Sequence, residues 1–142
     1  MEIHMKKLKI VGAAFAALTI FSFGGCGSPD EGVVKDAKVE KVGSKIYSEE
    51  EINEAIDAVK DYFAENFDGC RLDKIAYAGD KATKRENEYQ PENSEAIVIT
   101  SDFYVFPNGG DGSLNTDQNY TDWNWILVRT SDGKWEHLSH GY

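Results

Sequence analysis

Apolar side chains recur at three- and four-residue spacing between Ser48 and Gly69, the pattern of an amphipathic helix with one buried face. Ser48 and Glu51 match a capping box, in which the N-cap residue and the third helical residue bond each other's backbone. Gly69 suits a left-handed helix end. The sequence therefore predicts one helix from Ser48 to Gly69. Its apolar stripe consists of Ile52, Ile56, Val59, Phe63 and Phe67.

Four later segments have the alternating or β-branched character of strands. They cover 70–78, 95–106 with a bend near Ser101 and Asp102, 120–130, and 135–142. The polar stretch from Gly79 to Ser94 is expected to be a loop or a long hairpin connection. The predicted fold is α+β, with one amphipathic N-terminal helix on a four-stranded antiparallel curved sheet.

The first 25 residues have the form of a secretory signal peptide. Lys6, Lys7 and Lys9 form a positive start, and 14 uncharged residues follow at 10–23. As a helix this run spans only about 21 Å, which is too short for the ~30 Å hydrocarbon core of a bilayer. Met5 is an alternative start to Met1.

The residues before Cys26 decide the type of leader. Phe23-Gly24-Gly25-Cys26 resembles a bacterial lipobox, with Phe23 where that motif usually has Leu. Cys26 is therefore the predicted lipid acceptor, and the alternative is an ordinary secreted protein cut near Gly25. Lipid on Cys26 leaves Cys70 without a disulfide partner, so Cys70 is expected to be a small buried residue.

Composition divides the chain and limits its partners. We expect a signal peptide at 1–25, a lipidated and flexible linker rich in Gly, Ser and charged residues at 26–45, and one domain at 46–142. The formal net charge is −10. This acidity excludes nucleic acid as a partner. The predicted location is the outer face of the cell membrane, contacted through the lipid on Cys26.

The glycine-rich loop from Pro107 to Asn119 holds several oxygen ligands, which is a pattern that can wrap Ca²⁺. Asp111, Asn115 and Asp117 are its candidate ligands. The spacing departs from an EF-hand, because Thr116 stands where the sharp turn needs Gly. The alternative is a turn-rich connection whose Asn, Asp and Gly residues serve left-handed backbone. No cofactor is otherwise expected.

Alternation on the third predicted strand places Trp123, Trp125 and Leu127 on one face. Core packing is the ordinary role of such a face. Trp123, nearest the polar loop, is also the candidate platform for a sugar or an apolar ligand. His137 and His140 are three apart on a strand, so they are expected to point to opposite faces and not to share a metal.

Two stretches carry a resemblance to a known family. They are Ser101-Asp102-Phe103-Tyr104-Val105 running into Asn108-Gly109-Gly110-Asp111-Gly112-Ser113-Leu114-Asn115, and 120–129 running to Trp135 and Gly141-Tyr142. Over about 46–142 the chain resembles a family of uncharacterised domains found in small lipoproteins of Firmicutes, which often have Trp where this chain has His140. The resemblance implies a cystatin-like or nuclear-transport-factor-2-like fold and no activity.

The sequence favours a non-enzymatic, lipid-anchored binding or interaction domain whose partner is a cell-envelope protein or a glycan. No catalytic residue is assigned, because the chain has no nucleophile-elbow, HExxH or CxxC motif. One alternative is an enzyme that processes a small ligand with a pocket carboxylate, Asp102 or Asp122, in the cavity of the curved sheet. The other is a structural component of the envelope.

Overall fold

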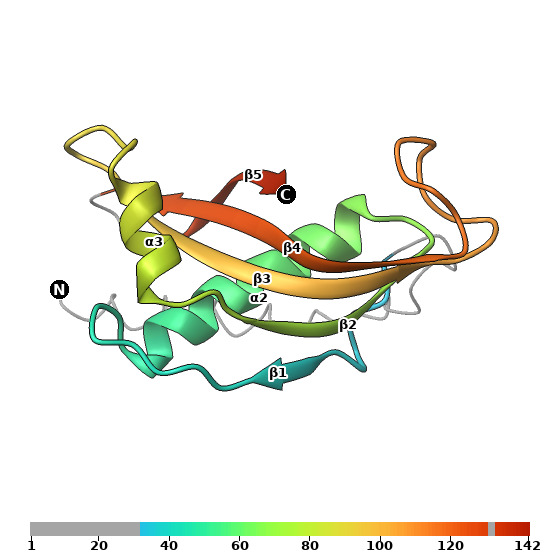
Figure 1. The fold of residues 1–142 in the computed structure, drawn as a ribbon, viewed down its shortest axis with the longest axis horizontal. Helices are drawn as coiled ribbons and strands as arrows, with labels where there is room; N and C mark the ends of the chain where they lie inside the picture. Colours follow the sequence, from blue (N-terminus) through green and yellow to red (C-terminus); the bar gives the residue numbers. More distant parts are fainter. Residues whose placement is uncertain (1–31, 131–132) are drawn as a thin grey trace, which may run out of the picture.

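A computed structural model describes residues 32–130 and 133–142 (Figure 1). The predicted signal peptide and Cys26 lie outside the described residues. In chain order the elements are β1 (Lys38–Glu40), α2 (Glu49–Asn66), β2 (Cys70–Tyr77), α3 (Asp80–Asn87), β3 (Glu95–Val105), β4 (Gln118–Arg129) and β5 (Glu136–Gly141). None of the helices in this part of the chain is long and apolar enough to cross a membrane.

The strands form one sheet in the order β1-β2-β3-β4-β5. The pairs β2–β3, β3–β4 and β4–β5 are antiparallel, whereas β1 pairs with β2 in parallel. The fold class, α+β, is confirmed, but the prediction of four strands and of a helix at the start of the fold was wrong. β1 was missed because it has three exposed residues, two of them charged, within a segment whose composition is that of a linker.

The residues just before β1 also bond to the domain. Gly32 donates its N–H to the Ala64 carbonyl of α2 at 3.1 Å, and Val33 forms a parallel bridge with Arg71 at the start of β2. A Cβ atom at Gly32 would lie 2.3 Å from the Phe63 carbonyl oxygen, so only glycine fits there. The chain therefore joins the domain beside the carboxyl-terminal end of α2.

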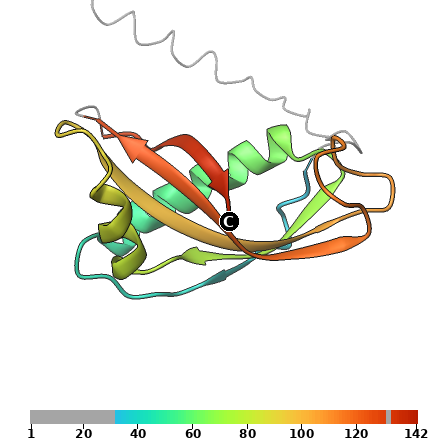
Figure 2. The ribbon, with the colours of Figure 1, turned by 45° about the horizontal axis from the view of Figure 1, so that its top comes forward.

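Helix α2 lies across one face of the curved sheet (Figures 1 and 2), and its buried face forms one side of the core. The predicted capping box is confirmed, with Ser48 and Glu51 bonding each other's backbone. The predicted stripe is buried against β2, β3 and β4. Its sheet-side partners include Leu72, Ile75, Ile97, Ile99, Phe103, Trp125 and Leu127.

At the amino end of α2, Arg129 ties the helix to the sheet. Its guanidinium lies 2.8 Å from the Glu51 carboxylate of α2 and 3.0 Å from the Glu95 carboxylate of β3. The same group stacks over the Trp135 ring at 4.3 Å, and Tyr47 donates its hydroxyl to Glu95 at 2.8 Å. These contacts fix the amino end of α2 against the sheet where β3 begins.

Two β-bulges lie beside each other in the sheet, on either side of Asp102 in β3, and bend it there. The register between β2 and β3 shifts at Asp73, and the register between β3 and β4 shifts at Thr121 and Asp122. Asp122 has a φ of 57°, and its N–H donates to the Asp102 carboxylate at 3.0 Å. Because bulges increase local twist and bend a strand, the two shifts curve the sheet around α2 at the position where a bend was predicted.

Helix α3 occupies the stretch that was expected to be a loop, and it completes the edge of β3 beyond the end of β2. The Asn87 amide donates to the Ala96 carbonyl at 2.9 Å and accepts from the Ala96 N–H at 2.8 Å. Thr83, fully buried, accepts from the Val98 N–H through its hydroxyl at 3.1 Å. Side chains of a helix thus replace the backbone of a neighbouring strand.

Replacing Asn87 with Ala should therefore lower the free energy of unfolding by about 1–3 kcal/mol, because the Ala96 N–H loses its acceptor and the Ala96 carbonyl loses one of its two donors, keeping the Tyr47 hydroxyl. Urea denaturation followed by tryptophan fluorescence measures this change. Asn53→Ala is the matched control, since Asn53 is an exposed residue of α2, and it should change stability by no more than about 0.5 kcal/mol. Equal effects of the two substitutions would contradict the edge-completing role of Asn87.

Candidate functional site

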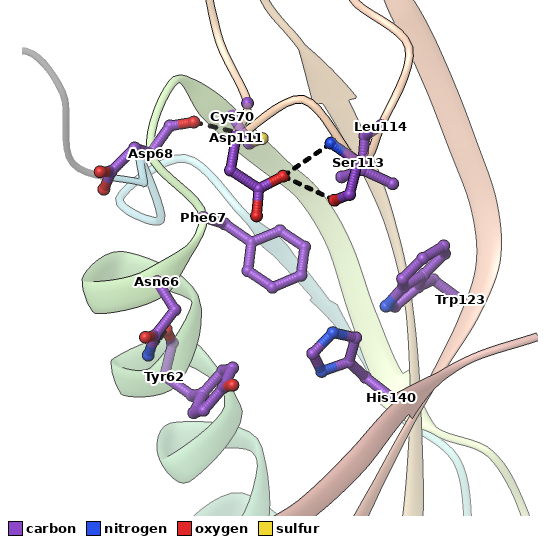
Figure 3. A pocket seen from close by; sticks show the side chains of 11 residues that line it. Tyr62, Asn66, Phe67, Asp68, Cys70, Asp111, Ser113, Leu114, Trp123 and His140 are labelled. Carbon is purple, nitrogen blue, oxygen red and sulfur yellow. Dashed lines mark hydrogen bonds between the residues drawn. The ribbon is translucent and has the colours of Figure 1, made fainter.

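A pocket of about 460 Å³ opens at the carboxyl-terminal end of α2, where the helix stops short of the end of the sheet (Figure 3). Four elements and a loop contribute to it: α2, the α2–β2 turn with the start of β2, the β3–β4 loop, β4 and β5. It is lined by Tyr62, Asn66, Phe67, Asp68, Cys70, Gly110, Asp111, Ser113, Leu114, Trp123 and His140. Its size is that of ordinary ligand pockets, ~300–1,000 Å³.

The β3–β4 loop is held over the pocket by contact between two glycines. Gly69 has the predicted left-handed conformation, with a φ of 71°, but α2 already ends at Asn66 with Phe67 as its C-cap. A Cβ atom at Gly69 would lie 2.3 Å from the Cα of Gly109. The carbonyls of Asp68 and Gly69 accept N–H groups from Gly110 and Phe106 at 2.8 and 3.0 Å. The backbones can approach so closely only because neither residue has a side chain.

Regular alternation along β4 places Trp123 on the same face as Trp125, toward α2, and the β4 bulge brings Tyr120 to that face as well. The rings of Trp123 and Tyr120 contact Phe103 at 5.3 and 5.2 Å between ring centroids. Trp123 is only 9% exposed, yet its indole Nε1 has no hydrogen-bond partner in the described part of the chain. In Figure 3 this nitrogen is on the side of the ring that faces the hollow between Phe67 and His140.

The structure separates the three predicted loop ligands. Asp111 lines the pocket, and its carboxylate accepts the N–H of Ser113 at 2.9 Å and its hydroxyl at 2.5 Å. Asp117 accepts the Tyr104 hydroxyl at 2.6 Å outside the pocket, while the Asn115 N–H donates to Tyr120. Within residues 32–130 and 133–142 no three His, Cys, Asp or Glu side chains are grouped to hold a metal ion. Calcium binding stays a prediction.

The prediction that His137 and His140 point to opposite faces was wrong. β5 contains a bulge at Leu138, so that His137 pairs with Leu127 and His140 pairs with Trp125. Both histidines consequently face α2, where Tyr62 stacks on His137 at a centroid distance of 3.8 Å. A strict period of two fails wherever an extra residue enters a strand.

Cys70 has the buried position that the sequence predicted. It is a free cysteine, 1% exposed, and it is one of the residues that line the pocket. Burial, with smaller contributions from the negative charges of Asp111 and Asp68, raises the pKa of its thiol to about 11. The thiol is therefore protonated at neutral pH and is a poor nucleophile.

The two carboxylates of the enzyme alternative lie elsewhere. Asp102 and Asp122 line a small hollow of about 230 Å³ together with Lys74, Ala76 and Thr100. Asp102 forms an ion pair with Lys74 at 3.5 Å. Neither carboxylate lines the pocket beneath α2, because both side chains alternate away from the core residues Phe103 and Trp123.

Of the predicted ligand-binding residues, Trp123 and Asp111 meet in one pocket. The sequence did not indicate the contributions of Tyr62, Asn66 and Phe67, because the last turn of an amphipathic helix has the same pattern whether it covers core or lines a pocket. Comparison of the chain with protein-family models, curated proteins and solved structures found no match.

The two histidines predict a dependence of stability on pH. Burial lowers the pKa of both rings, and the neighbouring His140 lowers that of His137 further. The unfolded chain, whose histidines have a pKa of about 6.5, therefore binds more protons than the folded one near that pH, so stability falls as the pH drops through it. We expect the melting temperature to decrease between pH 7.5 and pH 5.5.

A double variant, His137→Phe with His140→Gln, should show a flatter profile over this window, and Asn53→Ala, which removes no titratable group, should keep the slope of the parent chain. The lowered pKa of Glu51 acts in a separate window, because its contribution is lost only below about pH 4.5. A parent profile that is level from pH 7.5 to pH 5.5 would contradict the assignment to the histidine pair.

Proposed function

We propose that the chain is a bacterial lipoprotein, anchored through Cys26 on the outer face of the cell membrane, and that its domain binds a small hydroxylated ligand such as a glycan without transforming it. The fold is proposed to be cystatin-like or nuclear-transport-factor-2-like, in keeping with the resemblance to small Firmicutes lipoproteins. A helix lying across a curved sheet supports this fold. The proposed site is the pocket at the end of α2.

One observation carries the binding function: the Nε1 of Trp123 has no hydrogen-bond partner among residues 32–130 and 133–142, and it faces the pocket. A buried donor without an acceptor costs about 1–3 kcal/mol, and a ligand oxygen that reaches this nitrogen would remove the cost. The rings of Trp123, Phe67 and Tyr62 supply apolar faces around it. A fixed donor among aromatic rings is a common arrangement in ligand pockets.

The other polar groups of the pocket limit the ligand. Asp111 and Asn66 present acceptors, and Ser113 presents a hydroxyl that is already bonded to Asp111. The Asp111 carboxylate repels an anion, and the net charge of −10 adds to this repulsion. A ligand with hydroxyl donors, a carbonyl or hydroxyl acceptor for Trp123 and an apolar face fits these groups. A neutral sugar or an N-acetylated amino sugar has all three.

The enzyme alternative would need one of its carboxylates in this pocket. Because Asp102 and Asp122 line a different hollow, we take the binding function as the proposal. The sheet separates the hollow that contains the two carboxylates from the pocket, and Trp123 and Phe103 lie on the α2 side of the sheet.

Titration of the full chain in detergent with a panel of neutral sugars, N-acetylated amino sugars and uronic acids tests the proposal. We expect binding of a neutral or N-acetylated member, seen as a change in tryptophan fluorescence and as heat in calorimetry. Trp123→Phe keeps the ring and removes the donor, so it should weaken binding about fivefold, the equivalent of a hydrogen bond worth about 1 kcal/mol.

Trp135→Phe is the matched control. Its Nε1 is also buried and unpaired among the described residues, but Trp135 lies outside the pocket. The control should bind the ligand as tightly as the parent chain. Binding by no member of the panel, or equal affinities of the parent and Trp123→Phe, would refute the proposed site.

The anchor is tested separately by growing bacteria that express the full chain with an alkyne-labelled fatty acid. We expect the label on the protein and the protein in the membrane fraction. Cys26→Ser should remove the label and release the protein from the membrane. Cys70→Ser is the control and should retain the label, because Cys70 is buried in the domain. Label on the Cys26→Ser variant would show that the lipid site was misassigned.

A further inference from the structure

The bulge at Leu138 gives the domain a pair of imidazoles that face each other. Residues three apart on a regular strand point to opposite faces, but the extra residue turns His137 and His140 to the same one. The His137 Nε2 and the His140 Nδ1 lie 3.0 Å apart. Two ring nitrogens at this distance either share a proton or bind one metal ion.

The distance between the nitrogens selects a coordination geometry. Metal–nitrogen bonds to imidazole are about 2.0–2.1 Å long, so nitrogens 3.0 Å apart subtend an angle of roughly 95° at a shared ion. A tetrahedral ion would hold the two nitrogens about 3.3 Å apart at the same bond length. The pair therefore matches the near-right angle of square-planar or tetragonal ions, the geometry typical of Cu²⁺ and Ni²⁺.

The rings are held in place by aromatic neighbours. Tyr62 stacks on His137 with an interplanar angle of 13°, and the rings of Phe67 and Trp125 contact His140 at centroid distances of 5.3 and 5.1 Å. Burial lowers the pKa of both histidines, which favours the neutral form of each ring. Neutral imidazole is the form that binds metal.

We propose that His137 and His140 together bind one divalent transition-metal ion through Nε2 and Nδ1, with Cu²⁺ bound most tightly. Both facing nitrogens must be unprotonated in the complex, so the proton between them moves to the outer nitrogen of the ring that held it. The remaining coordination positions go to water or to exchangeable ligands. The site is independent of the proposed glycan ligand, although His140 also lines that pocket.

The experiment titrates the full chain carrying His4→Ala and Cys26→Ser, which removes the third histidine and the second cysteine of the sequence, with CuCl₂. Calorimetry should give one bound ion per chain, and electron paramagnetic resonance should give a tetragonal spectrum with splitting from two nitrogens. His137→Phe keeps a ring for Tyr62 to stack on and removes one ligand, and His140→Gln removes the other. Each variant should bind Cu²⁺ at least about tenfold more weakly.

Thermal denaturation without metal confirms that both variants remain folded before binding is compared. Absence of one-to-one binding by the parent overturns the proposal. Loss of binding in only one of the two variants also overturns it, because the ion would then not be held by both rings. A sugar titration of the metal-free parent is unaffected by either result, so failure of the metal site is distinguishable from failure of the glycan site.

Discussion

The structure depends on a mismatch in length between its helix and its sheet. The 18 residues of α2 span about 27 Å, whereas the 12 residues of β4 span about 40 Å. One helix cannot cover the concave face of such a sheet. Arg129 fixes the amino end of α2 over the start of β3, so the uncovered part falls at the other end. The pocket is this uncovered part, closed at its side by the β3–β4 loop.

The bulges decide which side chains of β4 and β5 face α2. Without the extra residue on β4, Tyr120 and Trp123 would lie on opposite faces, and without the one on β5, His137 and His140 would do so. Each insertion shifts a strand by one position and reverses the faces of everything beyond it. The chemistry of the concave face thus comes from departures from regular pairing, while its core comes from regular pairing.

The same distinction separates what the sequence predicted from what it did not. The apolar stripe from Ile52 to Phe67, the capping box and the four main strands follow from local patterns, and the structure has them. β1 and α3 have little apolar pattern, since they are held by backbone pairing and by the side chains of Thr83 and Asn87. Alternation correctly placed Trp123 and Trp125 together but failed for the histidines, because no local signal marked Leu138 as an extra residue.

The point at which the chain joins the domain, Gly32, also bears on how the domain would be oriented at a membrane. Gly32 contacts the end of α2 that borders the pocket, and Cys26 precedes Gly32 by six residues. Six residues reach at most about 20 Å. A lipid on Cys26 would thus keep the mouth of the pocket within a short reach of the bilayer surface. The attachment would determine which way the domain faces as well as where it stays.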